Sequence, residues 1–157
     1  MKKLIFKKHS LLFVFMLLLT AAYIIFIWIH STMTAEESSI ESGNVLKLLN
    51  DFLVMIGLKG DLTDHIVRKS AHFCEFALLG FLSLWTAYIN NKRIVKNLLS
   101  VGFVCLATAV VDEYIQIFSV GRSAEVGDVV LDFFGACAGT LLFIAVTAII
   151  ALFRKIK

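Results

Sequence analysis

Ionisable side chains lie inside stretches of this sequence that are otherwise apolar. The clearest case is Asp112-Glu113, followed by Gln116, at the end of an apolar run that starts at Leu98. A charged residue inside a membrane span costs about 3 kcal/mol for Asp at the helix centre, so such residues are usually functional. Histidine and carboxylates together can act as an acid–base set that moves protons. The candidate catalytic residues are His72, Glu75, Asp112 and Glu113.

Basic side chains near these acids indicate that a ligand could be an anion. Arginine can bind a phosphate through two parallel hydrogen bonds, whereas lysine binds it as a point charge. The candidate ligand-binding and anion-binding residues are Arg68, Lys69, Gln116, Arg122, Asp128 and Asp132.

Three other roles for these polar residues stay open. The basic side chains could only neutralise the acids, since buried charges in membranes pair with one another by default. Histidine with several carboxylates could hold a divalent metal such as magnesium, calcium or manganese. An ion or proton path would need polar residues toward the other side of the membrane, where the sequence offers few. We assign no metal ligand and no cofactor, and the sequence does not decide between an enzyme and a binding protein.

The composition places these residues in a membrane protein. Of the 157 residues, 59% are hydrophobic, compared with about 45–50% in soluble domains. Four apolar runs predict transmembrane spans at residues 11–29, 70–88, 98–118 and 129–153. The net charge of +3 is explained by the ends of the chain, so it does not indicate a nucleic-acid partner. We expect an all-α polytopic membrane protein, a four-helix transmembrane bundle in which residues 1–157 form one domain.

The loops predict how this bundle is oriented. Basic residues cluster at both ends of the chain and in the 90–97 loop, which the positive-inside rule places in the cytoplasm. The 31–66 segment then forms an extracellular loop, and residues 45–56 have the apolar spacing of a short amphipathic helix. We expect this helix to lie on the membrane surface or to cap the bundle.

Helical spacing gathers the polar residues of three spans into stripes. At about 100° per residue, each of these spans has one polar face. The stripes are Arg68, His72 and Glu75 on the second span, Asp112, Glu113 and Gln116 on the third, and Asp128 and Asp132 on the fourth. All three reach the same outer leaflet, so they should face one another rather than lipid. Gly135 and Gly139 share the face of the two aspartates and predict a close helix contact.

Two stretches of the chain resemble the VanZ-like family. The first is Arg68-Lys69-Ser70-Ala71-His72-Phe73 with Glu75-Phe76 and Leu79-Gly80, and the second contains Asp112-Glu113, Gln116, Gly121-Arg122-Ser123, Asp128, Asp132, Gly135 and Gly139. The resemblance covers about residues 60–140. The sequence departs from the family pattern at Val120 and Ala124, where proline is frequent, at Phe76, where an aromatic hydroxyl is common, and at Asp132, where asparagine is common.

The resemblance implies a multi-pass protein of the bacterial plasma membrane that affects the cell envelope or susceptibility to glycopeptides such as teicoplanin. It does not supply a reaction. We expect the polar residues to act at the outer leaflet on a cell-envelope or lipid-linked component, such as an anionic lipid or a cell-wall precursor. The alternatives are a membrane enzyme that acts on an anionic lipid head group and a non-catalytic structural or binding protein. The partners expected are the lipid bilayer and such a lipid, and the oligomeric state is not predicted.

Overall fold

The chain folds into five α-helices. The computed structural model describes residues 2–59 and 62–156, and no strand occurs within them. The helices are α1 (Lys2–Ser31), α2 (Ala35–Met55), α3 (Asp64–Asn91), α4 (Ile94–Gln116) and α5 (Val126–Ile156). Four segments are long and apolar enough to cross a membrane, namely Ser10–Ser31, Asp64–Asn91, Ile94–Gln116 and Val126–Lys155. The prediction of an all-α polytopic membrane protein is therefore confirmed.

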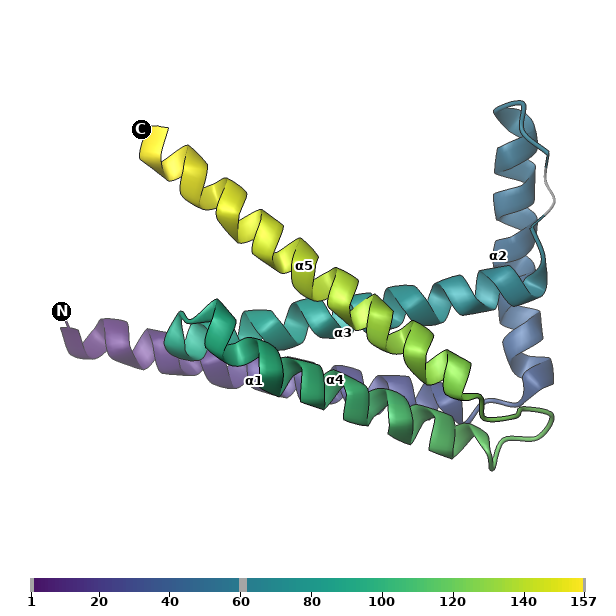
Figure 1. The fold of residues 1–157 in the computed structure, drawn as a ribbon, viewed down its shortest axis with the longest axis horizontal. Helices are drawn as coiled ribbons and strands as arrows, with labels where there is room; N and C mark the ends of the chain where they lie inside the picture. Colours follow the sequence, from purple (N-terminus) through teal and green to yellow (C-terminus); the bar gives the residue numbers. More distant parts are fainter. Residues whose placement is uncertain (1, 60–61, 157) are drawn as a thin grey trace.

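The other three long helices, α1, α4 and α5, are arranged around α3 (Figure 1). The helices α1, α3 and α4 run side by side, and α5 crosses α3 and then diverges from the others toward the C-terminus. The helix α2 runs across one end of this bundle. At that end α1 finishes at Ser31, α3 begins at Asp64, α4 finishes at Gln116 and α5 begins at Val126. We call it the α2 end.

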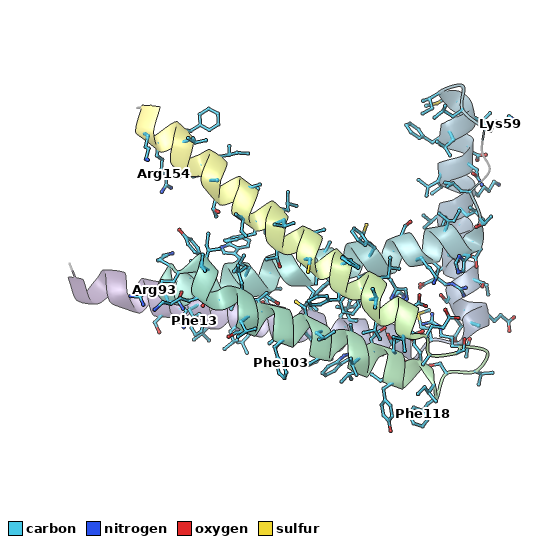
Figure 2. The ribbon with its side chains drawn as sticks, in the orientation of Figure 1. Phe13, Lys59, Arg93, Phe103, Phe118 and Arg154 are labelled. Atoms are coloured by element: carbon cyan, nitrogen blue, oxygen red, sulfur yellow. The ribbon has the colours of Figure 1, made fainter. Side chains whose placement is uncertain are left out.

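Large apolar side chains are exposed on the outside of the bundle. Phe103 on α4 and Phe118 after it are 73% and 71% exposed, and both point away from the other helices (Figure 2). Large apolar side chains of this kind are stable against lipid tails but not against water. The exposed apolar surface therefore agrees with a bundle that lies in a membrane.

Glycines set the close crossing of α3 and α5. A Cβ atom added to Gly135 would overlap the carbonyl oxygen of Phe73, and one added to Gly139 would overlap that of Ala77. The two backbones are therefore in direct contact, which is how small residues four apart bring membrane helices together. This contact places the beginning of α5, with its aspartates, against α3.

Replacing Gly139 by alanine is expected to destabilise the protein by about 1–3 kcal/mol, because the new methyl group must push α5 away from α3. The matched control is Gly102→Ala on α4, where nothing lies within 4 Å of the added Cβ. That change should be neutral or stabilise by up to about 1 kcal/mol, because alanine is the better helix former. Thermal unfolding of both purified variants measures the difference. Equal melting temperatures would show that the crossing is not tightly packed.

The helix α2 is longer than the amphipathic helix expected over residues 45–56, because it begins at Ala35. Thr34 caps it: the Glu37 amide donates to the Thr34 hydroxyl at 3.2 Å, and the Thr34 amide donates to the Glu37 carboxylate at 2.8 Å. The Thr34 amide and the Thr34 hydroxyl both donate to the Glu37 carboxylate, at 2.8 and 2.9 Å, and so lower the pKa of Glu37. Threonine followed three residues later by glutamate is a recognised helix start, so the sequence carried the signal for the earlier boundary.

The loop between α4 and α5 is fixed to the end of α1 and to the start of α2. The Ser119 hydroxyl donates to the Ser31 carbonyl at 2.9 Å, and the Ala35 amide donates to the Val120 carbonyl at 3.0 Å. Gly121 follows with a φ of 77°, a conformation that favours glycine. The loop thus has defined contacts without the prolines of the family pattern, and it holds Arg122 at the α2 end.

Candidate functional site

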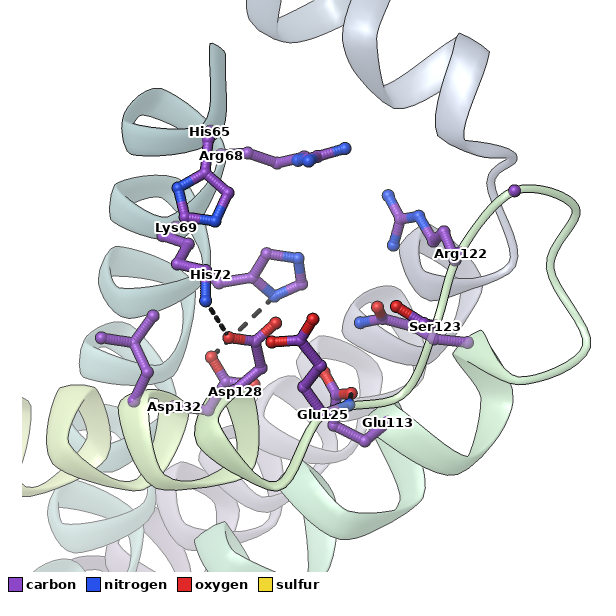
Figure 3. A pocket seen from close by; sticks show the side chains of 13 residues that line it. His65, Arg68, Lys69, His72, Glu113, Arg122, Ser123, Glu125, Asp128 and Asp132 are labelled. Carbon is purple, nitrogen blue, oxygen red and sulfur yellow. Dashed lines mark hydrogen bonds and ion pairs between the residues drawn. The ribbon is translucent and has the colours of Figure 1, made fainter. Parts of the chain in front are cut away.

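A polar cavity of about 140 Å³ opens at the α2 end of the bundle (Figure 3). It lies between α3, α4, α5 and the loop that precedes α5. The predicted site residues that line it are Arg68, Lys69, His72, Glu113, Gln116, Arg122, Asp128 and Asp132. The structure therefore brings the polar faces of three spans together, with Arg122 from the loop. Asp112 and Glu75 do not line the cavity: Asp112 lies close to His72 and Asp132, and Glu75 lies beside His30.

Asp112 joins two of the helices. Its side chain is fully buried, and one carboxylate oxygen accepts a hydrogen bond from the Ser31 hydroxyl at the end of α1. The other oxygen accepts one from the Gln116 side-chain amide at 2.9 Å. Both partners fix the orientation of the carboxylate, and one of them links α4 to α1.

Asp132 and His72 face each other beside Asp112. Asp132 is fully buried, and among the described residues neither of its carboxylate oxygens has a hydrogen-bond partner. The His72 Nδ1 atom is 3.9 Å from the nearer of these oxygens, which is too long for a hydrogen bond. A buried carboxylate that lacks partners is destabilising, so this arrangement indicates a missing interaction.

Two other acids of the cavity do have partners. Lys69 on α3 forms an ion pair with Asp128 on α5 at 2.6 Å. Glu113 on α4 accepts a hydrogen bond from the backbone amide of Glu125 at 2.9 Å, which ties the loop to the cavity wall. These contacts agree with a neutralising role for Lys69, as one of the alternative interpretations of the sequence expects.

Arg68 and Arg122 are different, because neither forms an ion pair with a residue that the structure describes. Their guanidinium groups face each other across the mouth of the cavity (Figure 3). Burial and the positive charge of Arg68 lower the pKa of Arg122, although a guanidinium stays protonated at neutral pH. Two half-buried positive charges of this kind form a site that favours an anion.

An apolar groove of about 310 Å³ meets the polar cavity at these arginines. Its walls come from α2 and the first turns of α3. The apolar residues that line it are Val45, Leu49, Leu62, Ile66, Val67, Ala71 and Cys74. Arg68, His72 and Arg122 line both the groove and the polar cavity. The two spaces therefore adjoin each other at these three residues, which form the junction between them.

Sequence reasoning missed the contribution of α1. His30 lies between two acids, with Nδ1 3.0 Å from Glu75 and Nε2 3.1 Å from Glu41. This contact places Glu75 on the groove side rather than in the polar cavity. His30 and Ser31 are polar residues at the C-terminal end of the first apolar run, and at such a position a polar side chain usually contacts the membrane interface, so the signal in the sequence was weak. His65, Ser123 and Glu125, which are not among the predicted site residues, also line the cavity.

These features define a polytopic helical membrane protein with a polar cavity at one end. The VanZ/LLP1 family profile matches residues 12–151, so the chain belongs to the VanZ/LLP1 family. The match extends beyond the 60–140 region of the sequence resemblance and includes the first span, which supplies His30 and Ser31. No curated protein and no solved structure matches the chain.

Proposed function

We propose that the polar cavity binds the anionic head group of a lipid or lipid-linked cell-envelope component at the outer leaflet of the bacterial plasma membrane. The observation that carries this proposal is the pair Arg68 and Arg122, which face each other without acidic partners among the described residues. A phosphate between them would form charge-assisted hydrogen bonds with both guanidinium groups.

The adjoining apolar groove supports a lipid rather than a free anion. Arg68 and Arg122 lie where the polar cavity and the groove meet. A lipid with its head group at this junction could place an acyl chain between α2 and α3. The apolar walls of the groove suit an acyl chain, whereas a free anion would leave them uncovered.

The distribution of basic residues supports the orientation. Arg93 and Arg154 lie at the end of the bundle away from α2 (Figure 2). The positive-inside rule puts that end, and with it both termini, in the cytoplasm. The α2 end and its cavity then face the outer leaflet, where α2 can lie along the membrane surface.

A membrane enzyme that acts on the same head group is the second candidate. Its support is that His72 and Glu113 line the same cavity as the two arginines. These are the residue types that transfer protons, and an anion held at the arginines would lie beside them. A purely structural protein is less well supported, because ion pairing among the described residues accounts for Lys69 but not for Arg68 and Arg122.

Retention of lipid by the purified protein tests the proposal. Native mass spectrometry after incubation with phosphatidylglycerol or phosphatidylcholine should show preferential retention of the anionic lipid. Arg122→Gln should weaken that retention by about 10-fold or more, because it removes a charge-assisted hydrogen bond worth about 1.5–3 kcal/mol. The matched control is Arg93→Gln, an exposed position at the opposite end of the bundle. Equal retention of both lipids, or no effect of Arg122→Gln, would contradict the proposal.

A further inference from the structure

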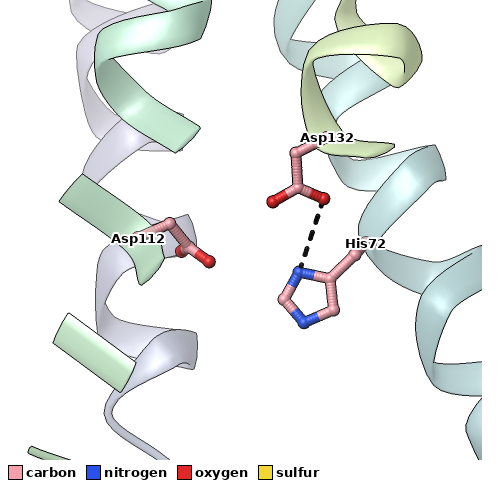
Figure 4. Close-up of side chains that lie close together, drawn as sticks. All are labelled: His72, Asp112 and Asp132. Atoms are coloured by element: carbon pink, nitrogen blue, oxygen red, sulfur yellow. Dashed lines mark ion pairs between the residues drawn. The ribbon is translucent and has the colours of Figure 1, made fainter. Parts of the chain in front are cut away.

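Three side chains from three helices converge at the wall of the polar cavity, and Figure 4 shows them close together. His72 comes from α3, Asp112 from α4 and Asp132 from α5, and each offers one ligand atom within 4.8 Å of the other two. Ligand atoms around a single divalent cation are separated by about 3–5 Å, because each lies about 2.0–2.6 Å from the ion. We propose that these three residues bind one divalent cation.

The state of Asp132 is an independent observation in favour of this site. The carboxylate is fully buried and points toward His72 and Asp112, and both of its oxygens lack a partner among the described residues. The lysine that lines the cavity, Lys69, is paired with Asp128 instead. A cation between Asp132 and Asp112 would supply the missing partner and offset the repulsion between two buried carboxylates.

Hydrogen bonds hold the Asp112 carboxylate in an orientation that suits a metal ligand. The Ser31 hydroxyl and the Gln116 amide each donate to one of its oxygens, and each oxygen keeps a lone pair free for a metal. Such outer partners are typical of metal sites, where they fix the direction of the ligand. Glu113 is not part of this group, because the three side chains whose ligand atoms lie within 4.8 Å of one another are His72, Asp112 and Asp132.

The donor set indicates which cation would bind. Two carboxylates and one imidazole suit Mn²⁺ or Zn²⁺ better than Mg²⁺ or Ca²⁺, which prefer oxygen ligands throughout. Three protein ligands leave at least one coordination position open, and both His72 and Asp132 line the polar cavity. The sequence assigns no metal ligand, so this site is an addition from the structure. It does not depend on the lipid proposal, because the cation can bind whether or not an anion occupies the cavity.

Titration of the purified full-length protein with Mn²⁺ or Zn²⁺ alone tests the site. The metal-free protein should bind one ion per chain in a saturable manner, and its melting temperature should rise on binding. Asp132→Asn should weaken the affinity for the metal by about 100-fold or more. Loss of a residue that only hydrogen-bonds to a metal ligand already lowers metal affinity by about 10–100-fold. Asp51→Asn, at an exposed position of α2, is the matched control and should bind as the wild type does. Mg²⁺ and Ca²⁺ are expected to bind more weakly in the same assay.

The results separate the cation site from structural and lipid-binding roles. If the wild type shows no saturable binding of Mn²⁺ or Zn²⁺, or if Asp132→Asn binds as tightly, the proposal is overturned. If Asp132→Asn fails to accumulate, His72→Gln provides the same test at another ligand. Anionic lipid retention without metal binding would leave the lipid proposal standing and reject this one, and metal binding without lipid retention would do the reverse.

Discussion

A bacterial strain that carries the Arg122→Ala variant is expected to show the same teicoplanin susceptibility as a strain that lacks the gene. Any difference that the intact gene makes should therefore disappear. The physical reason is that Arg122 is one of two cavity arginines without an acidic partner among the described residues. Its loss leaves only Arg68 at the junction of cavity and groove, so a bound anion would lose its two-sided contact. The measurement is the susceptibility of strains with matched amounts of protein in the membrane.

The controls for this experiment separate function from folding. Arg93→Ala removes the same side chain at an exposed position at the other end of the bundle, and it should leave susceptibility unchanged. Glu113→Ala removes an acid of the cavity and should act as Arg122→Ala does if the cavity functions as a unit. A loss of protein from the membrane in both cavity variants would instead show that these charges stabilise the fold. An Arg122→Ala strain that keeps the full difference would reject the role of the arginine pair.

The helical bundle and the meeting of the three polar stripes could be predicted from the sequence. Span lengths follow from runs of apolar residues, and the faces follow from the helical period. Residue spacing alone therefore predicts that the polar faces of three spans reach the same leaflet, but it puts Glu75, rather than His72, at the depth of Asp112 and Asp132. Charged side chains have few favourable positions in a bilayer, and this restriction is what makes the prediction strong.

The partner of each side chain could not be predicted. Among the described residues Lys69 pairs with Asp128 while Arg68 and Arg122 stay unpaired, and this depends on distances across helices that spacing does not give. The role of α1 was also hidden, because a polar residue at the end of a span, such as Ser31, is usually at the membrane interface. Only the packing of the α4–α5 loop onto α1 shows that Ser31 is buried against Asp112.

Asp112→Ala is expected to destabilise the protein by about 2–4 kcal/mol, because it removes the buried carboxylate that joins α4 to α1. The Ser31 hydroxyl keeps a second acceptor, the Ile27 carbonyl at 3.2 Å, but the Gln116 amide is left buried without its partner. The matched change is Asp112→Asn, whose amide can still exchange hydrogen bonds with Ser31 and Gln116. It should cost less than about 1.5 kcal/mol.

Thermal unfolding and metal titration of these two variants separate the two roles of Asp112. Asp112→Asn should unfold close to the wild-type temperature and yet bind Mn²⁺ or Zn²⁺ much more weakly, because an amide oxygen is a poorer ligand than a carboxylate. Asp112→Ala should lose both stability and metal binding. If both variants melt with the wild type, the contact between α1 and α4 does not depend on Asp112. If Asp112→Asn is as unstable as Asp112→Ala, the negative charge of the Asp112 carboxylate is what holds α1 and α4 together. A cation, or the dipoles of Ser31 and Gln116, must then stabilise that charge.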